Sequence, residues 1–269
     1  MGLAEIIPGV SGGTIALILG IYEDLITSIS KVDSYFFKQL FQRNFRQAWK
    51  YLDGPFLLKL FLGMICGILS LSSLIVLLIE LYPFFLKGFF SLLLLGSLFI
   101  EPLKLTRFNI RTSLGLLSSF LIAYILFNIP TLHFSNINSL YIFFGGLIAI
   151  CAFILPGISG SFILLLLGLY PFMMNALNEF NYVALSVFFS GCLVGLLLFV
   201  RILKKLYVDK KEFLEGLFPG LVFLSIPLIW KTDFDFFYSG QGSEYISQVF
   251  FGMLFGVSII IFLNKLRDF

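Results

Sequence analysis

One stretch occurs twice in the sequence, and it constrains the fold more than any other feature. Residues 8–22 and 156–170 align at a constant offset of 148, and nine of the fifteen positions are identical. Each copy starts with a proline–glycine–serine break, PGVSGGT in the first and PGISGSF in the second, and continues into an apolar run. Two such breaks in corresponding halves of a hydrophobic chain indicate a binding site built from interrupted helices.

The composition places the chain in a membrane. Apolar residues make up 59% of its 269 residues, phenylalanine alone accounts for 35, and the mean hydropathy is +1.02. Soluble domains are only about 45–50% apolar, whereas several apolar runs here reach the roughly 17 to 25 residues that cross a bilayer core. These runs do not alternate between polar and apolar residues, so the sequence predicts an all-α integral membrane protein.

Reactive side chains are few. Cys66, Cys151 and Cys192 lie in apolar runs without ligand spacing, which favours small core residues. The one histidine, His133, lies in a short polar loop, so neither a metal site nor a nucleophile–histidine pair is expected. We therefore expect no cofactor, no metal, no catalytic residue and no nucleic-acid partner.

Each motif copy is followed by three predicted spans. The first repeat, residues 1–130, comprises a hairpin at 1–30, an insert at 31–53 and spans at 56–81, 88–101 and 112–129. The second repeat, residues 139–269, comprises a hairpin at 140–177 and spans at 182–200, 214–230 and 245–263. The helix after the first break is roughly 24 Å long, short for a full crossing, so both hairpins are predicted to be re-entrant. The apolar run at 140–155 has no counterpart before the first motif, and we expect the chain to start late relative to its natural beginning.

Lysine and arginine set the predicted orientation. They gather in the insert, at 104–111, at 201–211 and near the C-terminus, which assigns these segments to the cytoplasm. The first hairpin then ends inside and the second outside, and three spans after each hairpin put the two halves in opposite orientations. The sequence predicts an inverted-topology repeat. A duplicated membrane protein whose motifs only pack helices together is the alternative.

The insert at 31–53 has its own character. Five basic residues alternate with aromatic and aliphatic residues spaced three to five apart. This pattern is typical of a basic amphipathic helix lying at the membrane interface. A solvated basic loop is the alternative, and either would be cytoplasmic.

The motif itself suits an anion. Proline ends the preceding helix, glycines allow close approach of a ligand, and the next helix presents free backbone N–H groups. Serine and threonine hydroxyls add donors, so phosphate is the anion that such a site fits best. Small-residue helix packing is the alternative use of these glycines. The candidate binding residues are Pro8, Gly9, Ser11, Gly12, Gly13 and Thr14 in the first copy and Pro156, Gly157, Ser159, Gly160 and Ser161 in the second.

A few ionisable residues complete the candidate site. Intramembrane carboxylates are functional candidates by default, and Glu5, three residues before the first motif, is the best placed to couple proton binding to anion binding. Glu101 ends a predicted span and is a second candidate. Arg111 and Arg201 stand at cytoplasmic span ends, where they could contact phosphate, although snorkelling is the commoner role.

The two motifs carry a resemblance to a known family. Residues 4–14, AEIIPGVSGGT, and 154–164, ILPGISGSFIL, resemble the paired signatures of the bacterial polyprenyl-phosphate transporter family, formerly a domain of unknown function. Residues 191–199 and 224–230 are also similar to it. The second copy differs from the first at Ser161 and Phe162, which stand where the first has Gly13 and Thr14, so both copies need not contact phosphate equally.

The resemblance implies a flippase in the bacterial cytoplasmic (inner) membrane, a multi-pass protein with a cytoplasmic C-terminus. Such a protein returns undecaprenyl phosphate from the outer to the inner leaflet for reuse as a cell-envelope lipid carrier. Membrane lipids would be its other partners, and a homo-oligomer stays open. Proton coupling through Glu5 is our hypothesis. A transporter of another small anion and, behind it, a lipid-phosphate enzyme are the alternatives.

Overall fold

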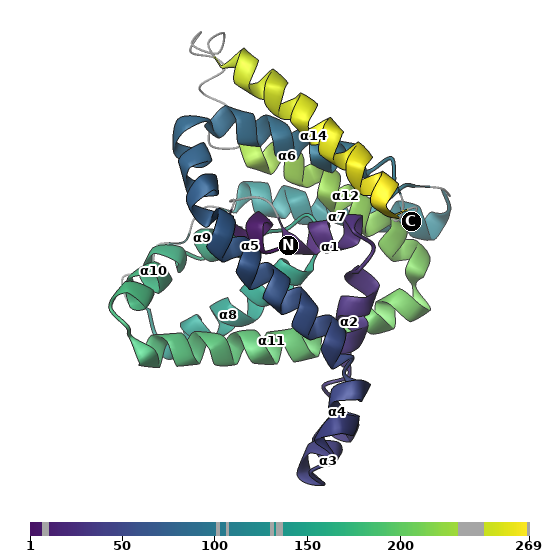
Figure 1. Ribbon diagram of the computed structural model, residues 1–269, viewed down its shortest axis with the longest axis vertical. Coiled ribbons are helices and arrows are strands. Elements are labelled where there is room, and N and C mark those ends of the chain that lie inside the picture. The colour runs from purple at the N-terminus through teal and green to yellow at the C-terminus, as the bar shows by residue number, and fades with distance from the viewer. Residues whose placement is uncertain are drawn as a thin grey trace.

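The computed structural model describes residues 1–6, 11–100, 103–105, 108–129, 132, 137–230 and 245–267, and this part of the chain is entirely helical (Figure 1). Four of its helices are long and apolar enough to cross a membrane: α5 (Gly54–Leu81), α7 (Ile110–Asn128), α11 (Tyr182–Asp209) and α12 (Lys211–Trp230). Two sharply bent helix pairs bring the total to as many as six. The chain is therefore a multi-pass membrane protein.

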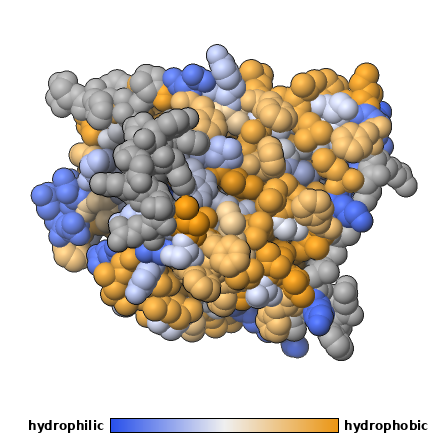
Figure 2. Space-filling model, turned by 90° about the horizontal axis from the view of Figure 1, so that it is seen from above, coloured by the Kyte–Doolittle hydropathy of each residue, from blue (hydrophilic) through white to orange (hydrophobic). Residues whose placement is uncertain are grey.

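The surface agrees with a lipid environment. Many large apolar side chains are exposed on the long helices, among them Leu69 on α5, Leu117 on α7 and Val183 on α11. Figure 2 shows a broad hydrophobic face, with the strongly hydrophilic residues mostly near its margins. Lipid chains rather than water suit such a surface, because monomeric soluble proteins rarely expose large contiguous apolar patches.

The two bent pairs follow the two motif breaks, and each bend divides what the sequence predicts to be one helix. In the first, the short 3-10 helix η1 (Gly2–Ile6) precedes α1 (Gly12–Ile18) and α2 (Tyr22–Ser30), and the last two meet at a bend of 117°. In the second, α8 (Ser139–Ile154) precedes α9 (Gly160–Leu166) and α10 (Tyr170–Asn178), which meet at 107°. Gly20 and Gly168 turn the two bends with φ of 73° and 65°, a left-handed backbone that glycine adopts readily.

The helices of the two halves correspond closely. The bounds of α9 and α10 are those of α1 and α2 shifted by 148, and the bounds of α11 are those of α5 shifted by 128. Two further helices of the halves are α6 (Pro83–Ser97) and α14 (Ile246–Arg267). By order along the chain, α6 corresponds to α12, and α7 corresponds to α14.

Close helix packing follows the same correspondence. Gly88 of α6 lies against the backbone of Val249, and Gly252 of α14 lies against the carbonyl of Phe85. In the same way Gly216 of α12 lies against the carbonyl of Thr112, and Gly115 of α7 against that of Phe213. Small residues allow such backbone approaches between membrane helices. The contact between α6 and α14 is thus made in the same way as the contact between α12 and α7, with a glycine of each helix against the backbone of the other.

One corresponding pair of glycines differs. Gly191 and Gly195 of α11 lie against the carbonyls of Phe143 and Leu147 on α8. At the equivalent positions of α5, a side chain on Gly63 would meet nothing within 4 Å, and one on Gly67 would meet only Leu3, at 3.8 Å. The glycine face of α5 is therefore much more open than that of α11.

The insert forms two helices rather than the single amphipathic helix that the sequence predicts. Helix α3 (Ser34–Phe41) and helix α4 (Phe45–Tyr51) are separated by a turn in which Arg43 has a φ of 59°. Left-handed backbone ends a helix. The helix is therefore interrupted at this turn, although the apolar spacing of the sequence continues through it. Figure 1 shows both helices projecting beyond the bundle.

Other helix ends also differ from the apolar runs. Helix α6 starts at Pro83 rather than residue 88, because proline is favoured in the first turn of a helix. Helix α11 continues past the apolar run to Asp209, and α12 starts at Lys211. Hydropathy marks where a segment becomes polar, whereas the helix itself continues wherever its backbone bonds can be made.

Candidate functional site

The start of α1 is capped by the first motif. Ser11, only 2% exposed, is its N-cap residue, and its hydroxyl oxygen accepts a 3.1 Å hydrogen bond from the N–H of Gly13. The same hydroxyl lies 3.3 Å from the carbonyl oxygen of Leu155 and 3.4 Å from that of Phe153, to which it can donate its proton. Ser11 therefore joins the first motif to the end of α8.

Glu5 occupies the position at which the motif was expected to receive an anion. Its Oε1 atom accepts a 2.5 Å hydrogen bond from the N–H of Gly12, the first residue of α1. A Cβ atom on Gly12 would lie 2.6 Å from the same oxygen, so no larger residue fits without moving the carboxyl group. A carboxylate at this end of a helix gains from the partial positive charge of the unpaired N–H groups.

The two motifs contact each other directly. The N–H of Gly157 donates a 2.8 Å hydrogen bond to Oγ1 of Thr14, and both residues are buried. Gly157 has a φ of 82°, and a Cβ atom there would collide with the backbone of Leu221. Only glycine combines this backbone with such close approach.

The second motif is capped differently from the first. Ser159 is the N-cap residue of α9, but its side chain makes no capping hydrogen bond to the helix. Its hydroxyl instead pairs with that of Ser161 at 2.7 Å. Ser11 thus caps α1, whereas Ser159, the equivalent residue of the second copy, bonds another hydroxyl instead of capping α9. Gly160 lies so close to α8 that a Cβ atom would be 2.8 Å from the carbonyl oxygen of Ala149.

Tyr22 is a part of this junction that was not among the candidate residues. Its hydroxyl donates a 3.1 Å hydrogen bond to the carbonyl of Ile154, and its ring meets Phe218 edge-on at 5.5 Å. A Cβ atom on Gly13 would lie 2.6 Å from the same carbonyl oxygen. The repeat contained a signal for this residue, because Tyr22 and Tyr170 are identical positions of the two copies.

The junction satisfies backbone groups that helix ends leave open. The last carbonyls of α8 have no partner within the helix, and the hydroxyls of Ser11 and Tyr22 donate to them. The first N–H groups of α1 are met by Ser11 and Glu5. Non-helical backbone at membrane depth is stable only when it is satisfied in this way.

The two candidate arginines contact residues outside the motifs. Arg201 donates a 2.6 Å hydrogen bond to the carbonyl of Val32, just after α2. Arg111 forms an exposed 3.3 Å ion pair with Glu212.

Among the remaining candidate residues, Pro156 is fully buried. Three other candidates, Pro8, Gly9 and Glu101, lie outside the described residues.

The junction gathers several hydrogen-bonding groups. It offers hydroxyl groups, backbone N–H groups and one carboxyl group, all near two helix starts. Among the residues that the structure describes, no three His, Cys, Asp or Glu side chains gather as a metal site requires. The donor set suits an oxyanion such as phosphate.

Comparisons with known proteins agree with one another. Residues 1–244 match the model of a family described as undecaprenyl phosphate translocase-like. The chain is 37% identical over 235 residues to a polyprenyl-phosphate transporter of Vibrio cholerae serotype O1, which covers 86% of this chain and 74% of the relative. It is 32% identical over 244 residues to a polyprenyl-phosphate transporter of Staphylococcus aureus, covering 82% of this chain and 80% of the relative. No solved structure matches the chain.

Proposed function

The chain belongs to the undecaprenyl phosphate translocase-like family, and we propose that it is a flippase for undecaprenyl phosphate. It moves this lipid from the outer to the inner leaflet of the bacterial cytoplasmic membrane, where the lipid is reused as a carrier in cell-envelope synthesis. The family and both relatives are named as transporters or translocases rather than as enzymes, which is the class of activity assigned here.

The proposed flippase is built as an inverted repeat. Helix α2 lies at one side of the bundle and α10 at the opposite side (Figure 1). The matching helix bounds and the matching glycine contacts of α6–α14 and α7–α12 support a relation between the halves. The side on which α2 ends carries the basic residues at the end of α11 and the start of α12, so it faces the cytoplasm, as does the C-terminus. Each hairpin then enters from one surface, and the two tips meet inside the membrane.

The phosphate head binds where the two tips meet. The observation that carries this proposal is the hydrogen bond from Gly157 to Thr14, because it brings the two motif copies into one site. Ser11, Gly12 and Gly13 supply donors from the first copy, and Ser159, Gly160 and Ser161 supply donors from the second. Several of these donors now have partners within the protein, so phosphate binds by exchanging with them.

Glu5 is the partner that phosphate displaces. Its carboxylate holds the N–H of Gly12 at 2.5 Å, and two anions cannot share that N–H without strong repulsion. Protonation of Glu5 removes its charge and releases the helix start to the phosphate. Proton binding and lipid binding are thereby coupled at one residue.

The prenyl tail stays in the lipid phase. The long helices expose apolar side chains along their length, such as Leu58 and Phe61 on α5 and Phe120 on α7. A tail of isoprene units can lie against this surface while only the head enters the protein.

Binding of undecaprenyl phosphate to the purified protein tests the proposal. We expect Ser11→Ala combined with Ser159→Ala to weaken binding at least tenfold, because both tips lose a hydroxyl group. The matched control is Ser118→Ala with Ser186→Ala, a half-buried and an exposed serine that each bond a carbonyl of their own helix. Unchanged binding in the first double variant would rule out the tips and direct attention to Arg111 and Arg201. Inorganic phosphate bound as tightly as the lipid would favour a small-anion transporter.

A further inference from the structure

The two helices of the insert enclose a groove. The insert hairpin, α3 and α4 with the turn between them (residues 34–51), projects from the bundle (Figure 1). A groove of about 490 Å³ lies along it. That volume falls within the roughly 300–1,000 Å³ of small-molecule binding pockets, so the groove is large enough for part of a lipid.

Specific contacts hold the hairpin in shape. Asp33 caps α3 by accepting a 2.9 Å hydrogen bond from the N–H of Phe36, and its other oxygen accepts one of 2.9 Å from the hydroxyl of Tyr51 on α4. Burial alone would raise the pKa of Asp33, but these hydrogen bonds outweigh it and lower the pKa below its usual value. Asn44 also donates to the side chain of Gln39 at 3.2 Å. These contacts fix α3 and α4 relative to each other and thereby fix the shape of the groove.

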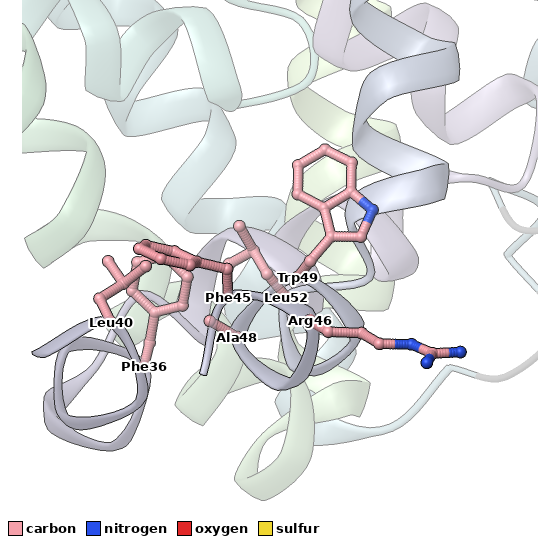
Figure 3. A pocket seen from close by; sticks show the side chains of 7 residues that line it. All are labelled: Phe36, Leu40, Phe45, Arg46, Ala48, Trp49 and Leu52. Carbon is pink, nitrogen blue, oxygen red and sulfur yellow. The ribbon is translucent and has the colours of Figure 1, made fainter. Parts of the chain in front are cut away.

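The walls of the groove are apolar. Rings and aliphatic side chains form them, together with the stem of one arginine: Phe36, Leu40, Phe45, Trp49, Leu52 and Arg46 (Figure 3). The ring of Trp49 packs directly on Gly54, the first residue of α5. The groove is therefore fixed against the start of a membrane helix.

One basic side chain lines the groove, and the segment that forms it is rich in others. Figure 3 shows the guanidinium group of Arg46 pointing away from the groove while its stem lies beside it. Lys31, Lys38, Arg43 and Lys50 belong to the same segment, against only Asp33 and Asp53. Arginine and lysine near a membrane place their stems in the apolar layer and their charge among the headgroups.

The surrounding surface favours immersion in lipid. Phe41 is 87% exposed, and Phe45 and Trp49 are also exposed. Aromatic side chains on one face with basic residues beside them are typical of helices that lie in the membrane interface. Basic residues there attract anionic lipids, each contributing about 1 kcal/mol near a charged membrane surface.

We propose that this groove binds an anionic phospholipid of the leaflet against which the insert hairpin lies. One acyl chain lies between α3 and α4 along Phe36, Phe45 and Trp49, and the phosphate of the headgroup pairs with Arg46. The occupant is a resident lipid distinct from the transported one. It would fix the start of α5 relative to the membrane surface.

Fluorescence of Trp49 provides the test, because the chain has only two tryptophans. The protein is placed in phosphatidylcholine nanodiscs that contain a small fraction of lipid with a spin label on its acyl chain. The label is carried either by phosphatidylglycerol or by phosphatidylcholine. Subtracting the Trp49→Phe variant isolates the signal of Trp49. We expect labelled phosphatidylglycerol to quench this signal at least twice as strongly as labelled phosphatidylcholine at the same mole fraction.

Two variants make the result specific. Arg46→Gln should reduce the difference between the two labelled lipids to near zero, whereas Lys205→Gln, an equal charge change at an exposed site on α11, should preserve it. Equal quenching by the two lipids in the wild type would overturn the proposal, as would an undiminished difference in Arg46→Gln. Loss of quenching on adding one equivalent of polyprenyl phosphate would also overturn it, because the transported lipid would then be the occupant.

Discussion

The N–H of Gly157 donates its 2.8 Å hydrogen bond to the hydroxyl of Thr14 across 143 residues of chain. Thr14 is 1% exposed, and Gly157 is held by its positive φ against the backbone of Leu221. Neither partner can turn toward water without moving a helix. The bond therefore reports whether the two hairpins are docked together.

Removing the acceptor should uncouple the hairpins. Thr14→Val keeps the shape of the side chain but leaves the N–H of Gly157 buried without a partner, which costs about 1–3 kcal/mol. We expect a lower thermal unfolding midpoint in detergent and weaker binding of undecaprenyl phosphate. Thr14→Ser keeps the hydroxyl and should retain most of both. Loss of stability and binding in Thr14→Ser but not in Thr14→Val would mean that the methyl group, rather than the hydroxyl, matters at this position.

Glu5 should determine how binding depends on pH. In the wild type, lowering the pH protonates Glu5 and frees the N–H of Gly12, so binding of the lipid phosphate should strengthen as the pH falls. Glu5→Gln is neutral at every pH and should lack this contribution to the pH dependence of lipid binding. The phosphate itself titrates near pH 6, and that contribution is common to both proteins. The difference between their binding curves from pH 5 to 8 isolates Glu5. Identical curves would contradict proton coupling at this residue.

Equivalent glycines in the two repeats should respond differently to the same substitution. Gly191→Ala puts a methyl group into the carbonyl of Phe143, and overpacking of this kind costs about 1–3 kcal/mol. Gly63→Ala meets nothing within 4 Å and should leave stability unchanged or raise it by up to about 1 kcal/mol. Denaturation of the two purified variants under identical conditions measures the contrast. Equal destabilisation would show that α5 carries a packed partner at Gly63.

The ends of the two hairpins should be accessible from opposite sides of the membrane. Single cysteines at Ser34, after α2, and at Glu179, after α10, are both exposed positions. They can be tested in a variant lacking Cys66, Cys151 and Cys192. A membrane-impermeant maleimide added to intact cells should label Glu179→Cys and not Ser34→Cys, and permeabilised cells should show labelling of both. Labelling of both from outside would contradict the inverted repeat.

The repeated motif made much of the fold predictable. Identity at offset 148 predicted equivalent elements in the two halves, and α1, α2, α9 and α10 repeat each other's bounds at that offset. The prediction of one continuous helix after each motif was wrong, because Gly20 and Gly168 bend it sharply. Gly88 and Gly216, which match at offset 128, both lie against neighbouring backbones, whereas Gly191 does so and its match Gly63 does not. Local sequence carries this information because a glycine or proline break acts on its own backbone.

Partners across the chain were not predictable in the same way. The sequence placed Glu5 near the first motif but could not reveal that it caps Gly12, since that contact depends on how η1 folds back. The hydrogen bonds of Ser11 and Tyr22 to the end of α8 span more than 130 residues. The break at Arg43 also escaped prediction, because an apolar period continues through a turn that only the backbone angles disclose.

The bond between Thr14 and Gly157 also has a consequence for direction. Two identical motifs could form such a crossing bond either way, and the two end states of a transport cycle would then have equal energy. The mirror-image bond would need a hydroxyl at residue 162, where the sequence has phenylalanine. The bond can therefore be made in one sense only. If the protein is the flippase proposed above, this mismatch would make the two end states of its transport cycle unequal in energy, and the protein would rest with its site facing one side of the membrane.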